Sequence, residues 1–321
     1  MATAEQLKSL IRSHFSDDPE RFYTLALQVA AHEAQQGHGE LAHDIRDIVD
    51  KARRDTRTIL KFPQDLRGLV LSEESKTPKA ALVVPAQLMK RIERVIHEYR
   101  QQHKLKQHGL SHRRKLMLIG PPGTGKTMTT RVLSHELRLT LHTVQVDKMV
   151  TKFMGETGAK LRQIFDLIQQ EAGLYLFDEF DAIGGERTLD NDVGEMRRVL
   201  NAFLQFIEQD VSDSLIVAAT NSPRLLDRAL FRRFDDVLHY RLPDEGDRRR
   251  LMKSILGDYL PPRCSWKATL SESEGLSHAE IDYACRDSIK QAILADKGKV
   301  SPALLRQMLK ERQTARQGQK G

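Results

Sequence analysis

The chain has 321 residues, of which 40% are apolar and 30% charged, and its formal net charge is +7. This composition is that of a globular protein with room for one large domain or two smaller ones. No apolar run is long enough to span a bilayer, and the first residues do not resemble a secretory leader, so we expect a cytoplasmic protein without a membrane span. The two cysteines, Cys264 and Cys285, suggest no disulfide framework and fit a reducing compartment.

The positive charge lies mainly after residue 75, with basic patches over residues 104–115 and 297–320. Patches of this kind bind nucleic acid or acidic protein surfaces in some proteins. In more proteins they are simply solvated, so the charge alone identifies no partner.

The first 60 residues have helical periodicity, with apolar residues such as Phe22, Leu25 and Val29 on one face. We therefore expect an N-terminal helical domain over residues 1–60, and we assign to it the binding of a client or partner. Residues 61–85 contain three prolines and little periodicity, which is typical of a linker.

Short apolar segments alternate with helical ones after residue 86. This alternation predicts an α/β domain over residues 86–243, with a parallel sheet flanked by helices. Beyond Pro243 only helical patterns occur, which predicts a helical domain over residues 244–312 and a disordered tail over 313–321. The expected strands are residues 116–119, 141–146, 174–177 and 215–219, and the expected helices are residues 86–103, 128–137, 158–170 and 195–208.

A complete phosphate-binding pattern, Gly-x-x-x-x-Gly-Lys-Thr, stands between the first of these strands and the helix that follows it. Glycines let successive backbone N–H groups turn toward phosphate oxygens, and the helix N-terminus adds partial positive charge. The strand–loop–helix context makes a chance glycine-rich turn a poor explanation, so we expect a nucleoside triphosphate to bind here. The ATP-binding residues are Gly120, Pro121, Pro122, Gly123, Thr124, Gly125, Lys126, Thr127 and Met128.

Two polar side chains of this loop have distinct expected roles. Lys126 should reach the β- and γ-phosphates, and the Thr127 hydroxyl should bind Mg²⁺. ATP and Mg²⁺ are therefore the expected cofactors.

Other polar residues follow two of the predicted strands. Asp178 and Glu179 end an apolar strand, where ligands of parallel sheets bind, so we assign Asp178 to Mg²⁺ and Glu179 to the attacking water. Asn221 follows the next strand and can contact the γ-phosphate and that water, although by itself it fits a turn before Pro223 equally well.

Arg232 and Arg233 stand side by side in a segment after Asn221. Paired arginines are usually solvated. Arginine is nevertheless the side chain that stabilises a transferring phosphoryl group when a neighbouring subunit supplies it.

Taken together, these motifs resemble those of the AAA+ ATPases, and more narrowly those of the AAA core clade of single-ring, protein-remodelling members. Residues 120–127 resemble the Walker A loop, residues 174–179 the Walker B strand, and residues 218–221 sensor 1. Arg232 and Arg233 fall at the arginine-finger positions. The resemblance covers about residues 80–310 and implies an α/β nucleotide domain, a C-terminal helical lid, and a homo-oligomeric ring, commonly a hexamer, with ATP between subunits.

The resemblance also gives a meaning to the short segment before residue 158. In this clade an aromatic–apolar–Gly–Glu loop lines the central pore and holds extended polypeptide. Apolar side chains in a short loop are hard to bury within one subunit. The pore-loop residues are Lys152, Phe153, Met154 and Gly155, and a second, weaker match lies in residues 186–194.

Some positions depart from the pattern of the clade. Arg232 and Arg233 lack the Pro-Gly that separates the two arginines in many members, and this compact Arg-Arg-Phe form resembles severing and membrane-remodelling relatives. Which arginine acts stays open. Residues 275–280 resemble the lid motif, in which Ala279 takes the place of a sensor 2 arginine and His278 replaces the usual glycine.

The function that this resemblance implies is an ATP-driven ring motor that remodels or unfolds a protein client by pulling it through a central pore. Some similar proteins work beside a separate protease, but the residues identify none. The alternative is a nucleic-acid loader or motor that uses the basic patches, although these lack interleaved aromatic residues for base stacking. A scaffold that binds ATP without hydrolysis is disfavoured by the intact Glu179 and Asn221.

Overall fold

The computed structural model describes residues 13, 19–56, 66, 68–152, 156–184, 190–225, 228–261 and 265–318. The chain divides into two compact units, Met1–Gln64 and Asp65–Gly321. Each unit is described by itself.

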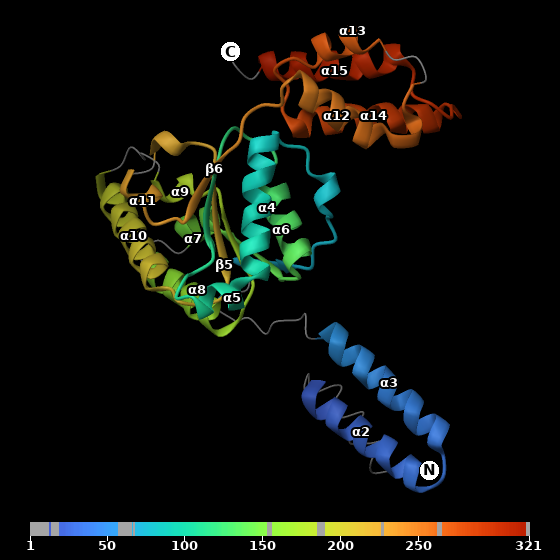
Figure 1. Ribbon diagram of the computed structural model, residues 1–321, viewed down its shortest axis with the longest axis vertical. Helices are drawn as coiled ribbons and strands as arrows, with labels where there is room; N and C mark the ends of the chain where they lie inside the picture. Colours follow the sequence, from blue (N-terminus) through green and yellow to red (C-terminus); the bar gives the residue numbers. More distant parts are fainter. Residues whose placement is uncertain are drawn as a thin grey trace. The chain divides into compact units, whose positions relative to one another are not determined.

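The first unit contains a pair of helices, α2 (Pro19–Gln35) and α3 (Gly39–Thr56) (Figure 1). Gly37, with φ +86°, lies in the turn between them, where a backbone conformation that favours glycine is needed. Tyr23 and Ala26 of α2 pack against Val49 of α3. The predicted N-terminal helices are confirmed.

The second unit is built on a six-stranded sheet in the order β1-β3-β4-β5-β2-β6. Five strands run parallel, and β1 pairs with β3 in the antiparallel direction. The predicted α/β class is confirmed, with a mixed sheet in place of a purely parallel one. The strands are β1 (Val70–Glu73), β2 (Lys115–Ile119), β3 (Leu141–Gln145), β4 (Leu174–Asp178), β5 (Leu215–Thr220) and β6 (Asp236–His239).

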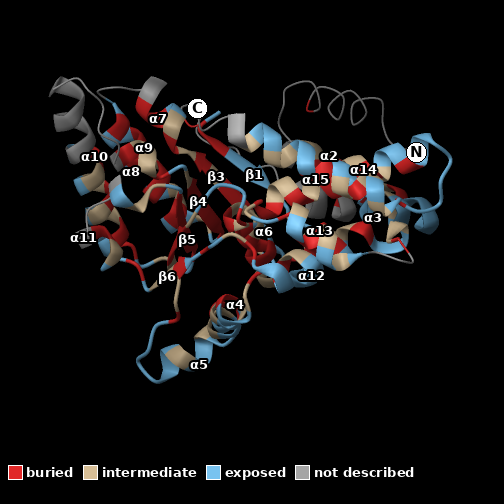
Figure 2. Ribbon diagram, turned by 90° about the horizontal axis from the view of Figure 1, so that it is seen from above, coloured by how far each residue is buried: buried red, intermediate tan, exposed pale blue. Residues whose placement is uncertain are grey.

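The strand β4 shows why the central strands are apolar at every position. Leu174 and Leu176 pack in the core on one face of the sheet. Tyr175 stacks on His142, and Phe177 packs against Phe165 and Phe203. Successive side chains of a strand point to opposite faces of the sheet. In a strand that is covered on both faces, the side chains on both sides are therefore apolar. The sheet is accordingly the most buried part of this unit (Figure 2).

Helices cover the sheet on both faces (Figure 1). The core on the side of α4 includes Leu88, Ile92 and Val95 of that helix and Val132 of α6, and the aromatic cluster on the other side joins α8 and α10. These helices are α4 (Ala86–Arg100), α5 (Gln102–Gln107), α6 (Lys126–Leu137), α7 (Val146–Lys152), α8 (Thr157–Gln170), α9 (Asp181–Gly184), α10 (Asp190–Gln209) and α11 (Arg228–Phe231).

Four further helices form the predicted C-terminal helical segment, which we call the lid. Their shared core includes Leu251, Leu276, Ile281 and Leu305. Ser277 begins α14 with a capping box, in which its hydroxyl accepts from the Glu280 N–H and the Glu280 carboxylate accepts from the Ser277 N–H. The lid helices are α12 (Glu245–Leu256), α13 (Trp266–Glu272), α14 (His278–Leu294) and α15 (Pro302–Gly318).

Residues 236–239 form the edge strand β6, which was not predicted. Two further segments differ from the sequence prediction. Residues 70–73, expected within a linker, form the edge strand β1, of which only Val70 is buried. Residues 313–318, expected in a disordered tail, continue α15. The Gln313 amide donates to the Glu274 carbonyl at 3.2 Å and the Arg316 guanidinium donates to the Gly275 carbonyl, so tertiary contacts hold the last turns of this helix in place.

None of the helices in the described part of the chain is long and apolar enough to cross a membrane.

Burial of His142 predicts a pH-dependent stability. Its Nδ1 hydrogen-bonds with the Ser72 hydroxyl at 2.8 Å, its ring stacks on Tyr175 with centroids 4.6 Å apart, and burial lowers its pKa from 6.5 to about 4. In the unfolded chain the His142 ring therefore takes up a proton near pH 6.5, whereas in the folded chain it does so only near pH 4. The contribution of the neutral His142 ring to the free energy of unfolding is therefore complete above pH 6.5, and it is lost as the pH falls from 6.5 to about 4.

We expect His142 to account for a loss of about 2 kcal/mol in unfolding free energy between pH 7 and pH 5. His142→Gln should reduce the pH dependence by that amount, measured by urea unfolding of the full chain at both pH values. The exposed His97→Gln is the matched control and should leave the dependence as it is. An unchanged dependence in His142→Gln would contradict this account.

Candidate functional site

The site is built where three parallel strands end at one level. In the register of the sheet, Ile119 at the end of β2 pairs with Thr220 at the end of β5, and Phe177 of β4 pairs with Ala218 of β5. The phosphate loop, the acidic pair and Asn221 lie at the carboxyl ends of these three strands, and therefore at the same edge of the sheet. The carboxyl edge of a parallel sheet is where such folds bind ligands.

The phosphate loop is shaped by glycines and by hydrogen bonds between its own residues. Gly123 has φ +71°, and Gly125, the N-cap of α6, has φ +100°, both in the region that favours glycine. The buried Thr124 hydroxyl donates to the Pro121 carbonyl at 2.7 Å, while Met128 packs against the sheet core. The loop is thus set at the N-terminus of a 12-residue helix, which is a favourable position for an anion.

Lys126 lies at the centre of the site with only 6% of its surface exposed. Its Nζ donates to the carbonyls of Gly120 and Pro121 at 2.6 and 2.9 Å and to Asn221 Oδ1 at 2.7 Å. Burial lowers the pKa of Lys126, and the charges of Asp178 and Asp181 oppose that shift. Two residues that are 95 positions apart, Lys126 and Asn221, are therefore in direct contact.

The two residues expected to hold Mg²⁺ also meet. The Thr127 hydroxyl donates to Asp178 Oδ2 at 3.3 Å, so a hydroxyl and a carboxylate oxygen lie side by side next to the phosphate loop. Mg²⁺ prefers oxygen ligands and usually takes only one or two from protein carboxylates, with phosphates and water completing its shell. Within the described residues, no three His, Cys, Asp or Glu side chains form a cluster suited to a metal. The hydroxyl and the carboxylate together fit an ion whose remaining ligands are phosphate and water.

Glu179 stands at the exposed end of β4 in an unusual backbone conformation. Its φ is +50°, and its N–H donates to Asp178 Oδ1 at 2.9 Å. Partial burial raises the pKa of Glu179, and the negative charges of Asp147, Asp178 and Asp181 add to that shift. Non-glycine residues in this conformation are uncommon and cluster at functional sites.

Asp181 is a site residue that the sequence prediction missed. Its Oδ1 accepts from the Thr220 hydroxyl at 3.1 Å and from the Asn221 N–H at 3.3 Å. The neighbouring Phe180 N–H donates to the Ala219 carbonyl at 2.9 Å. The turn after β4 therefore holds the turn after β5 in place. The only signal in the sequence is an acidic residue two positions after Glu179.

The lid contributes a second set of missed contacts. The Ala279 N–H, in the first turn of α14, donates to the Gly123 carbonyl at 3.0 Å. A Cβ added to Gly123 would lie 2.8 Å from the Ser277 hydroxyl oxygen and 3.1 Å from the Ala279 Cβ. Glycine at this position thus serves two purposes, the turn of the phosphate loop and the close approach of the lid.

Arg232 and Arg233 follow α11 and are exposed. Arg233 forms an ion pair with Glu208 of α10. Arg232 makes no hydrogen bond or ion pair with any residue that the structure describes, and neither arginine contacts the phosphate loop of its own chain. The structure therefore places five of the predicted site residues together, and the two arginines lie away from them. The five residues are Lys126, Thr127, Asp178, Glu179 and Asn221.

The predicted pore loop falls largely outside the described residues. Lys152 is the last residue of α7, and Phe153, Met154 and Gly155 are not described. In the weaker match over residues 186–194, the helix α10 begins at Asp190 and residues 186–189 lie outside the described part.

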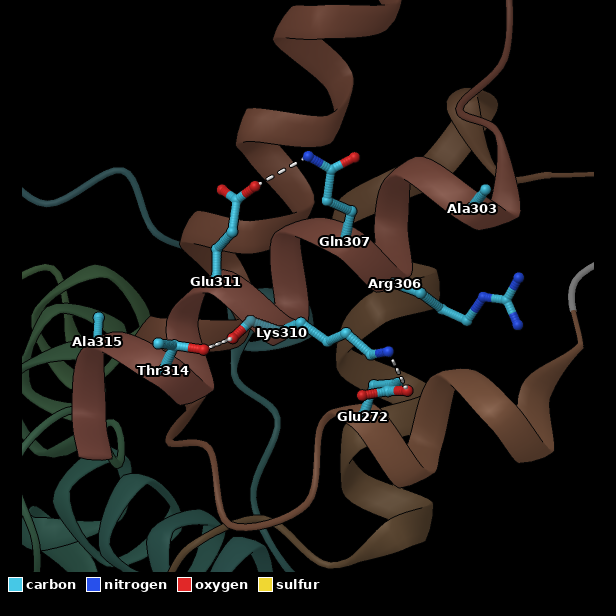
Figure 3. Close-up of a pocket in the computed structure, with 8 residues that line it drawn as sticks. All are labelled: Glu272, Ala303, Arg306, Gln307, Lys310, Glu311, Thr314 and Ala315. Atoms are coloured by element: carbon cyan, nitrogen blue, oxygen red, sulfur yellow. Dashed lines mark hydrogen bonds and ion pairs between the residues drawn. The ribbon is translucent and has the colours of Figure 1, made fainter. Parts of the chain in front are cut away.

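A separate groove of about 650 Å³ lies on the lid between α13 and α15 (Figure 3). Lys310 pairs with Glu272 at 3.3 Å, and the Gln307 amide donates to Glu311 at 3.0 Å. These four side chains are thus paired with one another, and Arg306 is a further charged residue of the lining.

Residues 116–242 match the model of the family described as "ATPase family associated with various cellular activities (AAA)". This range contains β2 except for its first residue, every residue of the loop, the acidic pair, Asn221 and both arginines.

Similar proteins have been described. An uncharacterized AAA family ATPase of Sinorhizobium fredii is 29% identical, with 99% of this chain and 98% of that protein covered. A protein of Methanocaldococcus jannaschii described as a 26S proteasome regulatory subunit homolog is 28% identical over 75% of this chain and 66% of its own length. The proteasome-activating nucleotidase of Methanoculleus marisnigri is 34% identical over 60% of this chain. The chain spans about half the length of that nucleotidase.

We expect Asp181→Ala to lower the turnover of ATP about 10- to 100-fold while changing the affinity for ATP little, since Asn221 would lose the acceptor that orients it but the loop would stay intact. The measurement is steady-state ATPase activity beside equilibrium binding of a non-hydrolysable ATP analogue. Asp213→Ala, before the other end of β5, is the matched control. Equal turnover in both variants would show that Asp181 does not position Asn221.

Proposed function

We propose that the chain is an AAA family ATPase that works as an Mg²⁺-dependent ring motor, commonly hexameric in this family, and that it remodels or unfolds a protein client. One observation carries the proposal. Lys126, Thr127, Asp178 and Asn221 converge at the strand ends, whereas Arg232 is exposed, has no partner among the residues that the structure describes, and lies outside the site of its own chain. A phosphoryl-transfer site of this kind needs a further cation, which a neighbouring subunit can supply.

The residues of the loop fit a triphosphate and its hydrolysis. Phosphate oxygens would take over the Lys126 N–H bonds that the Gly120 and Pro121 carbonyls now accept, and Asn221 would orient the γ-phosphate from the next strand. Mg²⁺ held by Thr127 and Asp178 would neutralise charge on the transferring group. Glu179, whose pKa is raised by partial burial and by the neighbouring carboxylates, would orient and deprotonate the attacking water.

The two arginines are given different roles by their contacts. Arg233 pairs with Glu208 within its own subunit, which partly neutralises its charge. Arg232 is free to extend toward the phosphate of an adjacent subunit. We therefore assign the arginine finger to Arg232 and a bracing role to Arg233.

Two considerations support a protein client over a nucleic acid. Several relatives carry names that refer to the proteasome, which acts on proteins. Part of the positive charge that motivated the nucleic-acid alternative is paired within the chain, as in Lys106 with Asp213, Lys310 with Glu272 and Arg312 with Asp287. Phe153 and Met154 are assigned to grip extended polypeptide, and a separate partner protease is compatible with this role.

Mixing two inactive variants tests whether sites are shared between subunits. Arg232→Ala and Glu179→Gln should each abolish most ATP turnover. In mixed rings, the intact Glu179 of one subunit can meet the intact Arg232 of its neighbour, so activity should return on mixing. Arg233→Ala alone should retain more activity than Arg232→Ala. Absence of any recovery after subunit exchange, verified by mass spectrometry of the mixed assemblies, would argue against a finger supplied by the neighbour.

The pore-loop assignment is tested with a client captured by the Glu179→Gln variant, which should bind ATP and release the client slowly. We expect Phe153→Ala to keep ATP turnover within about twofold of the unsubstituted chain, because the residue is assigned no role in ATP binding or hydrolysis, yet to lose most remodelling of that client. Phe153→Tyr is the conservative control and should retain remodelling. Normal remodelling by Phe153→Ala would overturn the assignment, and capture of nucleic acid alone would favour the alternative function.

A further inference from the structure

Two of the three consecutive arginines in α12 have structural roles. The Arg248 guanidinium donates to the hydroxyl of Ser273, which follows α13, at 3.1 Å. The Arg250 guanidinium donates to the Val84 carbonyl at 3.1 Å, and residues 82–84 contribute to the cores of both the sheet and the lid. The charged groups of these two arginines are therefore used within the fold.

The third arginine, Arg249, and Lys253 one turn later have no such partner. Both side chains are exposed, and neither forms a hydrogen bond or an ion pair with any residue that the structure describes. Both lie instead over the ring of Trp266 in α13, with the Arg249 Cζ 5.3 Å and the Lys253 Nζ 5.7 Å from the ring centroid. Like charges four residues apart on a helix repel each other, so two cations at one ring concentrate positive charge at this place.

This cluster offers hydrogen-bond donors and no acceptor. The guanidinium and the ammonium carry donors only, and so does the Trp266 indole, whose N–H makes no hydrogen bond within the described part of the chain. The exposed Lys267 follows directly and adds a further ammonium. We call these four residues, Arg249, Lys253, Trp266 and Lys267, the lid patch. Its chemical complement is a negatively charged group with oxygen acceptors, such as a carboxylate or a phosphate.

Other cations of the lid are neutralised within it. Lys290 and Arg312 both pair with Asp287, at 3.0 and 2.6 Å, and Arg286 pairs with Asp282 at 2.7 Å. An ordinary solvated face of these helices thus carries both signs of charge. No acidic residue among those described pairs with the lid patch, so its complement is expected to come from another molecule.

The surroundings of the Trp266 ring favour an acidic peptide over a nucleic acid. The ring packs against the lid core and lies under both cations, whereas a single-stranded nucleic acid needs a free aromatic face on which a base can stack. Alternate side chains of an extended peptide project from one side about 6.6 Å apart. This spacing is close to the roughly 6 Å between Cβ atoms one helical turn apart. Two such carboxylates can therefore meet Arg249 and Lys253 at the same time.

We propose that the lid patch binds an extended acidic segment of a partner protein. Carboxylates at alternate positions of that segment accept from Arg249 and Lys253, and a further oxygen of the segment accepts from the Trp266 indole N–H. The inference goes beyond ATP hydrolysis and ring assembly, since no residue of the lid patch belongs to the nucleotide site.

The test uses the fact that Trp266 is the only tryptophan of the chain, so tryptophan emission reports on the lid patch directly. The probe is a capped peptide of alternating glutamate and serine, which has no aromatic residue of its own. It is titrated into the full chain at an ionic strength of about 0.15 M, where nonspecific attraction is screened. We expect a saturable shift in the emission of Trp266, and no shift with the same peptide carrying glutamine in place of glutamate.

Matched variants separate the lid patch from the net charge of the protein. Arg249→Gln and Lys253→Gln should each weaken binding of the peptide about 2- to 5-fold, as expected for exposed ion pairs. Lys104→Gln removes the same charge from an exposed position on α5 and should leave the affinity unchanged. All three side chains are exposed, so the variants should fold, which their circular dichroism spectra verify.

Several results would overturn the proposal. The first is the absence of a saturable shift with the glutamate peptide, and the second is a loss of affinity in Lys104→Gln equal to that in Arg249→Gln. Oligothymidylate and vesicles containing phosphatidylserine are titrated at the same ionic strength as competitors. Tighter binding of the oligonucleotide than of the peptide would assign the lid patch to nucleic acid, and tighter binding of the vesicles would assign it to a membrane surface.

Discussion

The common level at which β2, β4 and β5 end is the constraint on which the site depends. Lys126, Asp178 and Asn221 lie far apart in sequence, and the parallel register alone brings the ends of their strands to one edge. A shift of β5 by one residue would turn its alternate side chains to the opposite face and would separate Asn221 from Lys126. Burial of both sheet faces opposes such a shift, so the packing of the core also fixes the geometry of the site.

The burial of the sheet on both faces explains which strands could be predicted from the sequence. The central strands are apolar at every position because both faces are covered, which makes them visible as short apolar runs. The edge strands β1 and β6 were missed because their side chains are partly exposed, as in Val70–Glu73, and their pairing is decided by neighbouring strands. Helix ends were less certain than helix existence, and Lys126–Leu137 begins two residues before the predicted range.

The residues of the site likewise divide into those that a local sequence pattern predicts and those that only tertiary contacts bring into the site. Lys126, Thr127 and Asp178 belong to local patterns whose spacing carries chemical meaning, so they could be named from sequence. The role of Asp181 and the approach of Ser277 to Gly123 arise only from tertiary contacts, since neither has a local pattern of its own. The ion pair of Arg233 with Glu208 likewise distinguishes Arg233 from Arg232, and the sequence alone offers no basis for this distinction.

The contacts of Gly123 also make the lid and the phosphate loop mechanically dependent on each other. The Gly123 carbonyl accepts from α14, so a displacement of the loop by bound phosphate must either carry that helix or break its hydrogen bond. Within the lid, the Arg316 guanidinium of α15 binds the Gly275 carbonyl just before α14, and the helices share one core. The lid is therefore expected to move as a unit, and the places where the backbone can absorb that motion are residues 82–84 and the segment from β6 to α12.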